Sequence, residues 1–478
     1  MRVRTARIAA CVLLLGSVPV PGVSTTLMPA DLVRQPYPST YVPLPSQPVL
    51  IRDATVLDGR GQLIEHGSVL LSGGKVKAIG GAVTAPAGVT IIDGKGKWVT
   101  PGIIDVHSHL GAGPSPNVKG QDSINEFSGP INARGRIEHG VWPQDPGFSR
   151  ALINGVTTLQ ILPGSGNLFG GLSVVLKNVP ARTVQGMKFP GAPYGLKMAC
   201  GEVPIYSYNR ADHAYGDLGV FPATKMGNFI GYREQWIKAQ RYLADWREYA
   251  DALARGVRNL RPPERDLNLE TLAAVLTGDV IVHMHCHRAD EMVQVLDMAH
   301  EFGYRMGAFH HAQEAYKIAD ILARESAHEG VCVAMWADWW GYNMESNDGI
   351  PENIAMVHAA GGCAMLHSDS ETGGQHLNQE AAKALADGRR MGLDISAAAA
   401  WQWLSYNPAK ALGIADRTGS LEAGKMADLV IWDGDPFSVY TRTDKVFVDG
   451  ALVFDRADPR HLPVSDFELG QVGEGDRK

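Results

Sequence analysis

The stretch DVIVHMHCHRADEMVQVLDMAHEFGYRMGAFH, residues 279–310, shows the pattern that decides the fold. Residues 279–285 and 304–310 are typical of buried strands. Between them, residues 289–303 have the apolar spacing of a helix and end on a glycine. The alternation continues in the helix-like residues 312–325, 351–361 and 377–392 and in the strand-like residues 331–336 and 363–369. Strands and helices that alternate at this spacing predict parallel strands joined by crossover helices.

Earlier strands extend this pattern toward the N-terminus. The runs IIDVH (103–107), VTTLQIL (156–162) and YGLKMAC (194–200) are strand-like, and a third barrel strand is placed near residues 173–177. The alternation thus covers residues 103–413, enough for a (β/α)8 (TIM) barrel of roughly 250 residues with insertions. A doubly wound open sheet is the alternative, but the segment GGAVTAP is a poor match to the glycine-rich phosphate turn of that fold.

Both ends of the barrel segment are flanked by short β-type runs split by glycines. They occupy residues 49–102 and return in residues 414–478, which also include a C-terminal tail. Neither piece is large enough to form a good core alone, so we expect a small β-sandwich built from both chain ends. The proline-rich residues 26–48 predict an extended lead-in with no strand or helix.

The N-terminus has the pattern of a secretory signal. Arg2, Arg4 and Arg7 precede an apolar run over residues 8–20, and small residues follow. The run is too short to span a bilayer as a stable helix, so residues 1–25 predict a signal peptide rather than an uncleaved anchor. No later apolar stretch reaches membrane-spanning length. We therefore expect a mature protein that is exported to the periplasm or the extracellular space, with no membrane partner.

The charge balance and the cysteine content indicate which partners and cross-links to expect. The chain has 44 lysines and arginines against 51 acidic residues and a net charge of −7, which gives no electrostatic reason to expect nucleic acid as a partner. Only four cysteines would remain in the mature chain: Cys200, Cys286, Cys332 and Cys363. Because so few cysteines do not make a disulfide framework, and a buried free cysteine behaves as a small hydrophobe, we expect no structural disulfide.

Histidines, a lysine and an aspartate lie at the ends of several predicted strands. Chemistry in such a barrel is located at the C-terminal strand ends. His107 and His109 end the first strand and share one face, so both imidazoles can bind one metal ion. Lys197 lies inside a buried strand, where a charged amine without a partner is costly. Asp369 ends the eighth strand.

Two further strands add histidines. His283, His285 and His287 alternate along the fifth strand and share a face, which turns Cys286 away from it. His310 and His311 are neighbours that should point in opposite directions, so only one of them should enter the barrel. Such side chains at four or five strand ends of one barrel indicate a metal site.

With these motifs the sequence resembles the amidohydrolase superfamily, and within it the branch related to imidazolonepropionase and to prolidase-like peptidases. The resemblance covers residues 49–455. It rests on PGIIDVHSH, LPGSGNLFGG, GLKMACGE, HCHRADE, HHAQEAYKIAD, WADWWGYNMES, HSDSETGG, NPAKALGI and GSLEAGKMADLVIWDGDP. One departure is Val203, where related sequences often carry asparagine.

The resemblance implies a site for two divalent metal ions, with zinc expected. His107, His109 and Asp369 would bind the first ion, His285 and His311 the second, and a carboxylated Lys197 would bridge them. His311 is preferred over His310 because the family has a histidine three residues before a glutamate, here Glu314. Asp369 would also move a proton during the reaction.

Other residues at the same strand ends are candidates for binding substrate. His287 lies one strand step beyond His285 and could bind it. The aromatic residues Trp336, Trp339, Trp340 and Tyr342 either line a substrate pocket or pack among themselves.

The expected activity is metal-dependent hydrolysis of an amide C–N bond in a dipeptide, an N-acyl amino acid or a cyclic amide. The substrate would be a small molecule or short peptide, and a homo-oligomer is compatible with this interpretation. A mononuclear metal deaminase is one alternative, but Arg288 occupies the place where such deaminases carry a proton-shuttling glutamate. A non-catalytic binding protein on the same fold is another, but it would be expected to have lost metal ligands.

Overall fold

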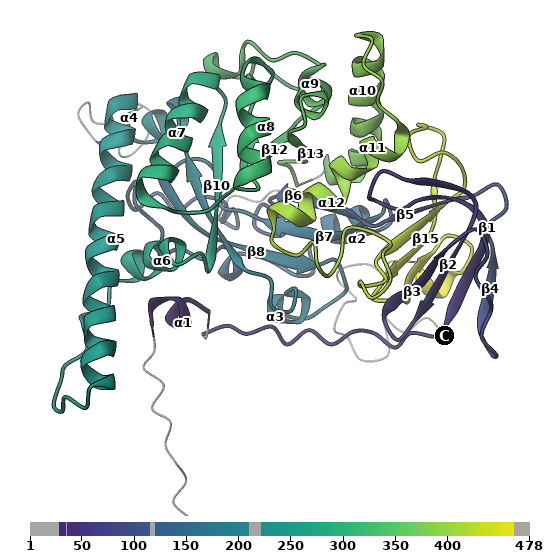
Figure 1. Cartoon of the computed structure of the whole chain (residues 1–478), viewed down its shortest axis with the longest axis horizontal. Helices are drawn as coiled ribbons and strands as arrows, with labels where there is room; N and C mark the ends of the chain where they lie inside the picture. The colour runs from purple at the N-terminus through teal and green to yellow at the C-terminus, as the bar shows by residue number, and fades with distance from the viewer. Residues whose placement is uncertain (1–27, 35, 115–119, 210–220, 372, 463–478) are drawn as a thin grey trace, which may run out of the picture.

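The computed structural model contains two eight-stranded sheets (Figure 1). It describes residues 28–34, 36–114, 120–209, 221–371 and 373–462. The predicted signal peptide, residues 1–25, lies outside the described residues, as does part of the predicted C-terminal tail. Within the described part of the chain, no helix combines the length and the hydropathy needed to cross a membrane.

The first sheet carries the barrel strands. They are β6 (Ile103–Ser108), β7 (Val156–Ile161), β8 (Phe169–Lys177), β9 (Tyr194–Ala199), β10 (Val280–Cys286), β11 (Met306–His311), β12 (Cys332–Met335) and β13 (Cys363–Leu366). They lie side by side in chain order. The backbone N–H of Asp369, just after β13, donates to the carbonyl of His107 in β6 over 2.8 Å. This bond joins the two edges at one point, so the sheet nearly closes into a barrel.

One strand departs from the expected parallel barrel. β8 is longer than the predicted segment 173–177, and it pairs antiparallel with both β7 and β9. The prediction of an all-parallel (β/α)8 sheet is therefore wrong at this strand. The connection between β7 and β8 is too short for the crossover that a parallel pair requires, so the chain turns back on itself.

Helices cover the outside of the barrel. They are α2 (Pro146–Leu152), α3 (Val184–Met187), α4 (Glu202–Asn209), α5 (Lys225–Ala254), α6 (Leu267–Leu276), α7 (Ala289–Phe302), α8 (Ala319–His328), α9 (Asn353–Ala359), α10 (Leu377–Arg390), α11 (Ala397–Trp401) and α12 (Tyr406–Ala411). Short 3₁₀ helices are η1 (Ile137–His139), η2 (Ala315–Ile318), η3 (Met344–Ser346), η4 (Gly373–His376), η5 (Gln402–Leu404) and η6 (Pro459–His461). Helix α7 ends as predicted at Gly303, whose φ of 71° is left-handed.

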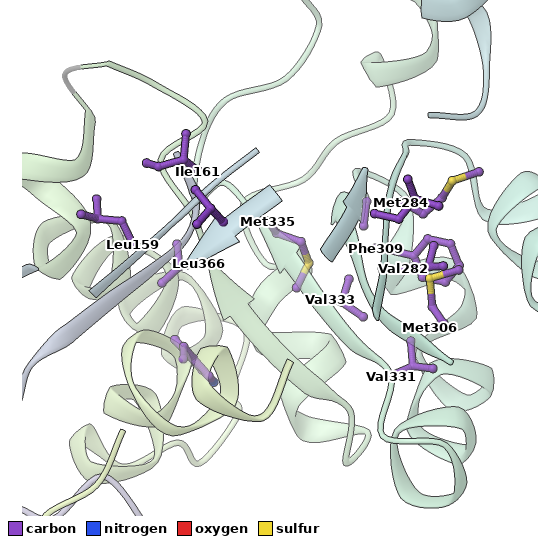
Figure 2. Close-up of a cluster of buried hydrophobic side chains, with 14 of the residues drawn as sticks. Leu159, Ile161, Val282, Met284, Met306, Phe309, Val331, Val333, Met335 and Leu366 are labelled. Atoms are coloured by element: carbon purple, nitrogen blue, oxygen red, sulfur yellow. The ribbon is translucent and has the colours of Figure 1, made fainter. Parts of the chain in front are cut away.

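Side chains along a barrel strand alternate between the hydrophobic core outside the sheet and the barrel interior. Val282 and Met284 of β10 lie in the main hydrophobic cluster (Figure 2). The same cluster includes Met292 of α7. His283 and His285 alternate with the two β10 residues and therefore face the other side of the sheet, the barrel interior. Burying the outward side chains against the helices fixes the register of β10, because a shift by one residue would put histidines into the apolar layer.

The second sheet joins strands from both ends of the described chain. It contains β1 (Val49–Leu57), β2 (Leu63–Ser72), β3 (Lys75–Gly80), β4 (Thr90–Asp93), β5 (Trp98–Pro101), β14 (Leu429–Trp432), β15 (Thr443–Val448) and β16 (Ala451–Asp455). β5 and β14 pair antiparallel, which connects residues before the barrel to residues after it. The domain limits 49–102, 103–413 and 414–478 stay predictions.

A buried ion cluster lies between the two sheets. Lys177, the last residue of β8, is fully buried, and its Nζ lies 3.0 Å from Asp428 Oδ1 and 2.8 Å from Asp449 Oδ2. Asp449 also accepts a hydrogen bond of 2.6 Å from the hydroxyl of Tyr41. The cluster therefore connects the barrel, the second sheet and the lead-in segment.

The prediction of a lead-in without any helix is wrong, because this segment contains a short one. α1 spans Pro29–Arg34, where a proline at the first helical position is tolerated. From α1 the chain runs along one end of the barrel to β1 (Figure 1). Lys188 Nζ donates to the carbonyl of Tyr37 over 2.7 Å, and Thr40 N–H donates to the carbonyl of Gln185 over 2.9 Å. The segment is thus hydrogen-bonded to the barrel.

The expectation of no disulfide is wrong. Cys200 is bonded to Cys286, with Cα atoms 5.2 Å apart, and Cys332 to Cys363, with Cα atoms 4.5 Å apart. Both pairs join neighbouring parallel strands, and Cys332 and Cys363 are direct register partners. The count of cysteines could not show this, because strand adjacency brings together residues far apart in the sequence.

Candidate metal centre

The predicted ligands of the first metal lie together at the C-terminal end of the barrel. His107 comes from β6, His109 follows that strand, and Asp369 follows β13. Asp369 Oδ1 is 3.1 Å from His107 Nε2 and 2.9 Å from His109 Nε2. Their donor atoms can all approach one cation, because they lie within 4.8 Å of one another.

The hydrogen bonds of His109 show that this arrangement fits a cation. Its Nδ1 lies 2.9 Å from the carbonyl of Leu162 and must donate to it, so a neutral imidazole presents an unprotonated Nε2. That lone pair faces the carboxylate oxygen of Asp369. Two acceptors this close need a positive charge between them or a proton on the ring. A divalent metal ion satisfies both atoms.

Lys197 lies beside His107 at the bottom of the site. It is fully buried, with Nζ 3.3 Å from His107 Nε2 and 3.0 Å from the carbonyl of Pro163. Burial lowers the pKa of Lys197 to about 8, although Asp369 acts in the opposite direction. A fraction of this amine is therefore neutral near pH 7, as carboxylation by CO₂ requires.

The predicted ligands of the second metal also have free donor atoms. His285 Nδ1 lies 2.9 Å from the hydroxyl of Ser165, and the ring centroids of His285 and His311 are 4.6 Å apart. Among the described residues, His285 Nε2 and His311 Nδ1 are buried and have no hydrogen-bond partner. Buried nitrogens without partners are costly, and a bound metal ion would satisfy them.

The expectation that only one of His310 and His311 enters the barrel is wrong, because both do. His310 Nδ1 lies 3.1 Å from His107 Nδ1, and His310 Nε2 lies 3.0 Å from His283 Nδ1. His311 instead reaches the Asp369 side of the site, with Nδ1 3.7 Å from Asp369 Oδ2. The strand ends here, and His311 has a φ of 73°. The left-handed backbone breaks the simple alternation and redirects this side chain.

His367 belongs to the site, although the sequence analysis did not select it. One possible ligand atom from each of His107, His311 and His367 lies within 4.8 Å of the other two. His367 Nε2 accepts a hydrogen bond of 3.3 Å from the backbone of His311, and its Nδ1 is buried without a partner among the described residues. The signal was present, because His367 lies two residues before Asp369.

The remaining candidate, His287, faces the loop after β12 that carries Trp336, Trp339, Trp340 and Tyr342. Its Nε2 lies 2.9 Å from the hydroxyl of Tyr342, and its Nδ1 is buried without a partner among the described residues. The loop therefore approaches the site through Tyr342, a specific contact that the sequence pattern did not predict.

Burial keeps the imidazoles neutral. It lowers the pKa of His283 to about 3 and the pKa values of His287 and His367 to about 4. Burial also lowers the pKa of His107, His285, His310 and His311 well below the usual value. Neutral imidazole is the form that binds metal ions, so the environment favours coordination over protonation.

Asp369 remains ionised in the same environment. Burial alone would raise the pKa of Asp369, but the neighbouring His109, His367 and Lys197 outweigh burial and lower it. Asp105 holds the adjacent turn, because its carboxylate accepts hydrogen bonds from the Ser368 N–H over 3.1 Å and from the Ser368 hydroxyl over 2.5 Å.

A model of the amidohydrolase family matches residues 98–453. The chain belongs to the amidohydrolase family. Amidohydrolase tasK of Hapsidospora irregularis is 33% identical over 77% of this chain. The aligned part is 38% of tasK, so the chain spans about two fifths of that relative. Imidazolonepropionase of Fusobacterium nucleatum subsp. nucleatum is 22% identical, covering 77% of this chain and 85% of its own length.

Solved structures also point to the amidohydrolase family. The crystal structure of an amidohydrolase from Thermotoga maritima MSB8 is similar with a TM-score of 0.74 and 33% identity, and the match covers 85% of this chain and 100% of that one. The predicted branch of the family is therefore confirmed. The family and the hydrolase names of these relatives support an enzyme that acts on C–N bonds, and the histidine cluster supports metal binding.

Proposed function

We propose that the protein is a metal-dependent amidohydrolase that cleaves an amide C–N bond in a dipeptide, an N-acyl amino acid or a cyclic amide. The observation that carries this proposal is the close approach of His109 Nε2 and the Asp369 carboxylate, 2.9 Å apart, while His109 Nδ1 faces the carbonyl of Leu162. A metal ion between the two atoms would satisfy both, and the family supplies hydrolases of this bond class.

The residues divide into two ligand groups. His107, His109 and Asp369 would hold one ion, His285 and His311 the other, and a carboxylated Lys197 would bridge them. Two divalent ions, expected to be zinc, would lower the pKa of a bound water to roughly 7 and polarise the scissile carbonyl. His367 is a further candidate ligand beside His107 and His311.

Asp369 is proposed to move the proton. Its Oδ1 faces His107 and His109, so Oδ2 is the atom left to take a proton from the attacking water. With 20% of its side chain exposed, Asp369 can be reached by substrate. The same carboxylate would then deliver the proton to the leaving nitrogen, and loss of a general base costs roughly 10²–10⁴-fold in rate.

The decisive variant is Asp369→Asn, which keeps the size of the side chain and removes the base. We expect kcat to fall about 10²–10⁴-fold on a hydrolysed dipeptide or N-acyl amino acid. Metal content should stay near two ions per chain, because the other ligands remain. The matched control is Asp416→Asn at a side chain that is 77% exposed, which should change neither value. Near-normal turnover with full metal content would remove Asp369 from the mechanism.

The deaminase alternative is weakened by Arg288. Its side chain is 45% exposed and pairs with Asp290 at 2.9 Å, so this position does not supply the proton-shuttling carboxylate of such deaminases. Ammonia release from free bases, with no hydrolysis of amides, would reverse the assignment. A protein without bound metal and without activity on either class would instead support a non-catalytic role.

Export of the protein is part of the proposal. Structural disulfides are typical of oxidising compartments and rare in the cytosol, so the two disulfides support removal of residues 1–25 and a periplasmic or extracellular location. A peptide or acylated amino acid taken from outside the cytoplasm is then the expected substrate, acted on by a monomer or a homo-oligomer.

A further inference from the structure

Aromatic rings extend outward from the metal centre in one contact series. Trp336 stacks on His311 with ring centroids 4.5 Å apart and an interplanar angle of 21°. Trp339 contacts Trp336 at 4.5 Å, and Tyr342 contacts Trp339 at 5.0 Å. The hydroxyl of Tyr342 returns to the centre at His287. We call Trp336, Trp339 and Tyr342 the aromatic wall.

Exposure increases along the wall. Trp336 is 8% exposed, and its indole N–H donates to the carbonyl of Ser368 over 3.2 Å, so this ring supports the site. Trp339 and Tyr342 are 48% and 43% exposed. Aromatic surface left in water costs free energy, and burying it against an apolar group recovers that cost.

Hydrogen bonds hold the wall in place. Gln313 Nε2 donates to the carbonyl of Trp339 over 2.8 Å, which ties the loop to the segment after β11. Asn343 and Ser346 form a capping box, and Gly341 N–H donates to the carbonyl of Ser346 over 2.8 Å. The exposed rings are therefore fixed by the fold beside the metal ligands, as a binding surface requires.

We propose that the aromatic wall is a specificity subsite that selects substrates with an aromatic or large apolar group next to the scissile amide. The inference rests on the proposed function, because it assigns a substrate class to the same site. The wall begins at the metal ligand His311 and ends at His287, so a group lying on Trp339 is close to the reacting carbonyl. A substrate with only a methyl group at that position leaves the rings in water.

The test compares two carboxylates that mimic products, phenylacetate and acetate, by calorimetric titration of the zinc-loaded full chain. The wild-type protein should bind phenylacetate at least about tenfold more tightly than acetate. Trp339→Ala should lose most of this preference while changing acetate affinity less than about twofold. Tyr440→Ala, at a 90% exposed residue between β14 and β15, is the matched control and should behave as wild type.

A second variant keeps the test decisive if Trp339→Ala is poorly folded. Tyr342→Phe retains the ring and removes the hydroxyl that contacts His287, so the preference for phenylacetate should survive. Melting temperatures of all variants report folding independently. Equal affinities for the two carboxylates in the wild type, or an unchanged preference in a folded Trp339→Ala protein, would overturn the proposal. Failure to hydrolyse any amide would refute the proposed function, whereas the affinity ratio still tests the wall.

Discussion

Replacing Lys177 by methionine is expected to destabilise the junction between the barrel and the second sheet. Methionine is similar in length and apolar, so the substitution removes the charge without opening a large cavity. It leaves the carboxylates of Asp428 and Asp449 buried, with 1% and 5% of their side chains exposed. Both lose their shared cationic partner.

The magnitude follows from what the carboxylates retain. Asp428 keeps hydrogen bonds of 2.8 Å from the hydroxyl of Thr418 and 2.9 Å from the backbone of Asp449. Asp449 keeps the hydroxyl of Tyr41. Removing one partner of a buried ion pair costs about 3–5 kcal/mol, and these remaining bonds place the loss nearer the lower value.

The stability lost in Lys177→Met should depend on pH. Burial and the nearby Asp428 raise the pKa of Asp449, so between its unfolded and folded pKa values the folded state binds more protons. Stability therefore falls as pH rises through that window. Without Lys177 the folded pKa rises further and the window extends upward. The destabilisation measured at pH 8 should exceed that at pH 5.

Urea denaturation of wild type, Lys177→Met and the double variant Lys177→Met/Asp449→Asn measures these free energies. Asparagine suits position 449, where φ is 47°, and it removes one buried charge, so the double variant should regain at least about 1 kcal/mol. Lys238→Met on the exposed side of α5 is the control, with a change below about 0.5 kcal/mol. A loss below about 1 kcal/mol for Lys177→Met, or none of the predicted pH trend, would refute the reasoning.

Two further predictions concern the cysteines and the N-terminus. Cys332→Ser should lower the free energy of unfolding by about 3–4 kcal/mol, because the disulfide to Cys363 closes a segment with a sequence separation of 31. Equal denaturation midpoints for this variant and the unreduced wild type would argue against the disulfide. Protein purified from its native host should begin between residues 22 and 30 by N-terminal sequencing, whereas full-length cytoplasmic protein would contradict the signal peptide.

Local features of the sequence were sufficient for much of the fold. The alternation of strand and helix after residue 279 has its cause within each segment, because an apolar period of two or 3.6 residues determines which face a strand or helix can bury. Gly303 ends its helix for an equally local reason. The clustering of His107, His109 and Asp369 followed from one general rule, that parallel strands of a barrel bring their C-terminal ends together.

Other features depended on contacts between distant segments. The antiparallel direction of β8 depends on its neighbours β7 and β9, which no local period specifies. The disulfide between Cys200 and Cys286 forms because β9 and β10 are adjacent, although 86 residues separate them in the chain. Sequence distance carries no information about such pairings.

The details of the metal centre show the same division. Residue types and spacing indicated a metal site, because histidines on one strand face must point into the barrel. The positive φ of His311, which lets it enter the site beside His310, arises where the strand ends and the backbone turns. Likewise, Tyr342 reaches His287 only because its loop folds back over the barrel. The sequence by itself determined which chemical groups are available and on which strands. The tertiary structure decided which of their atoms meet, since nearly closing the sheet and folding the loops set the distances between them.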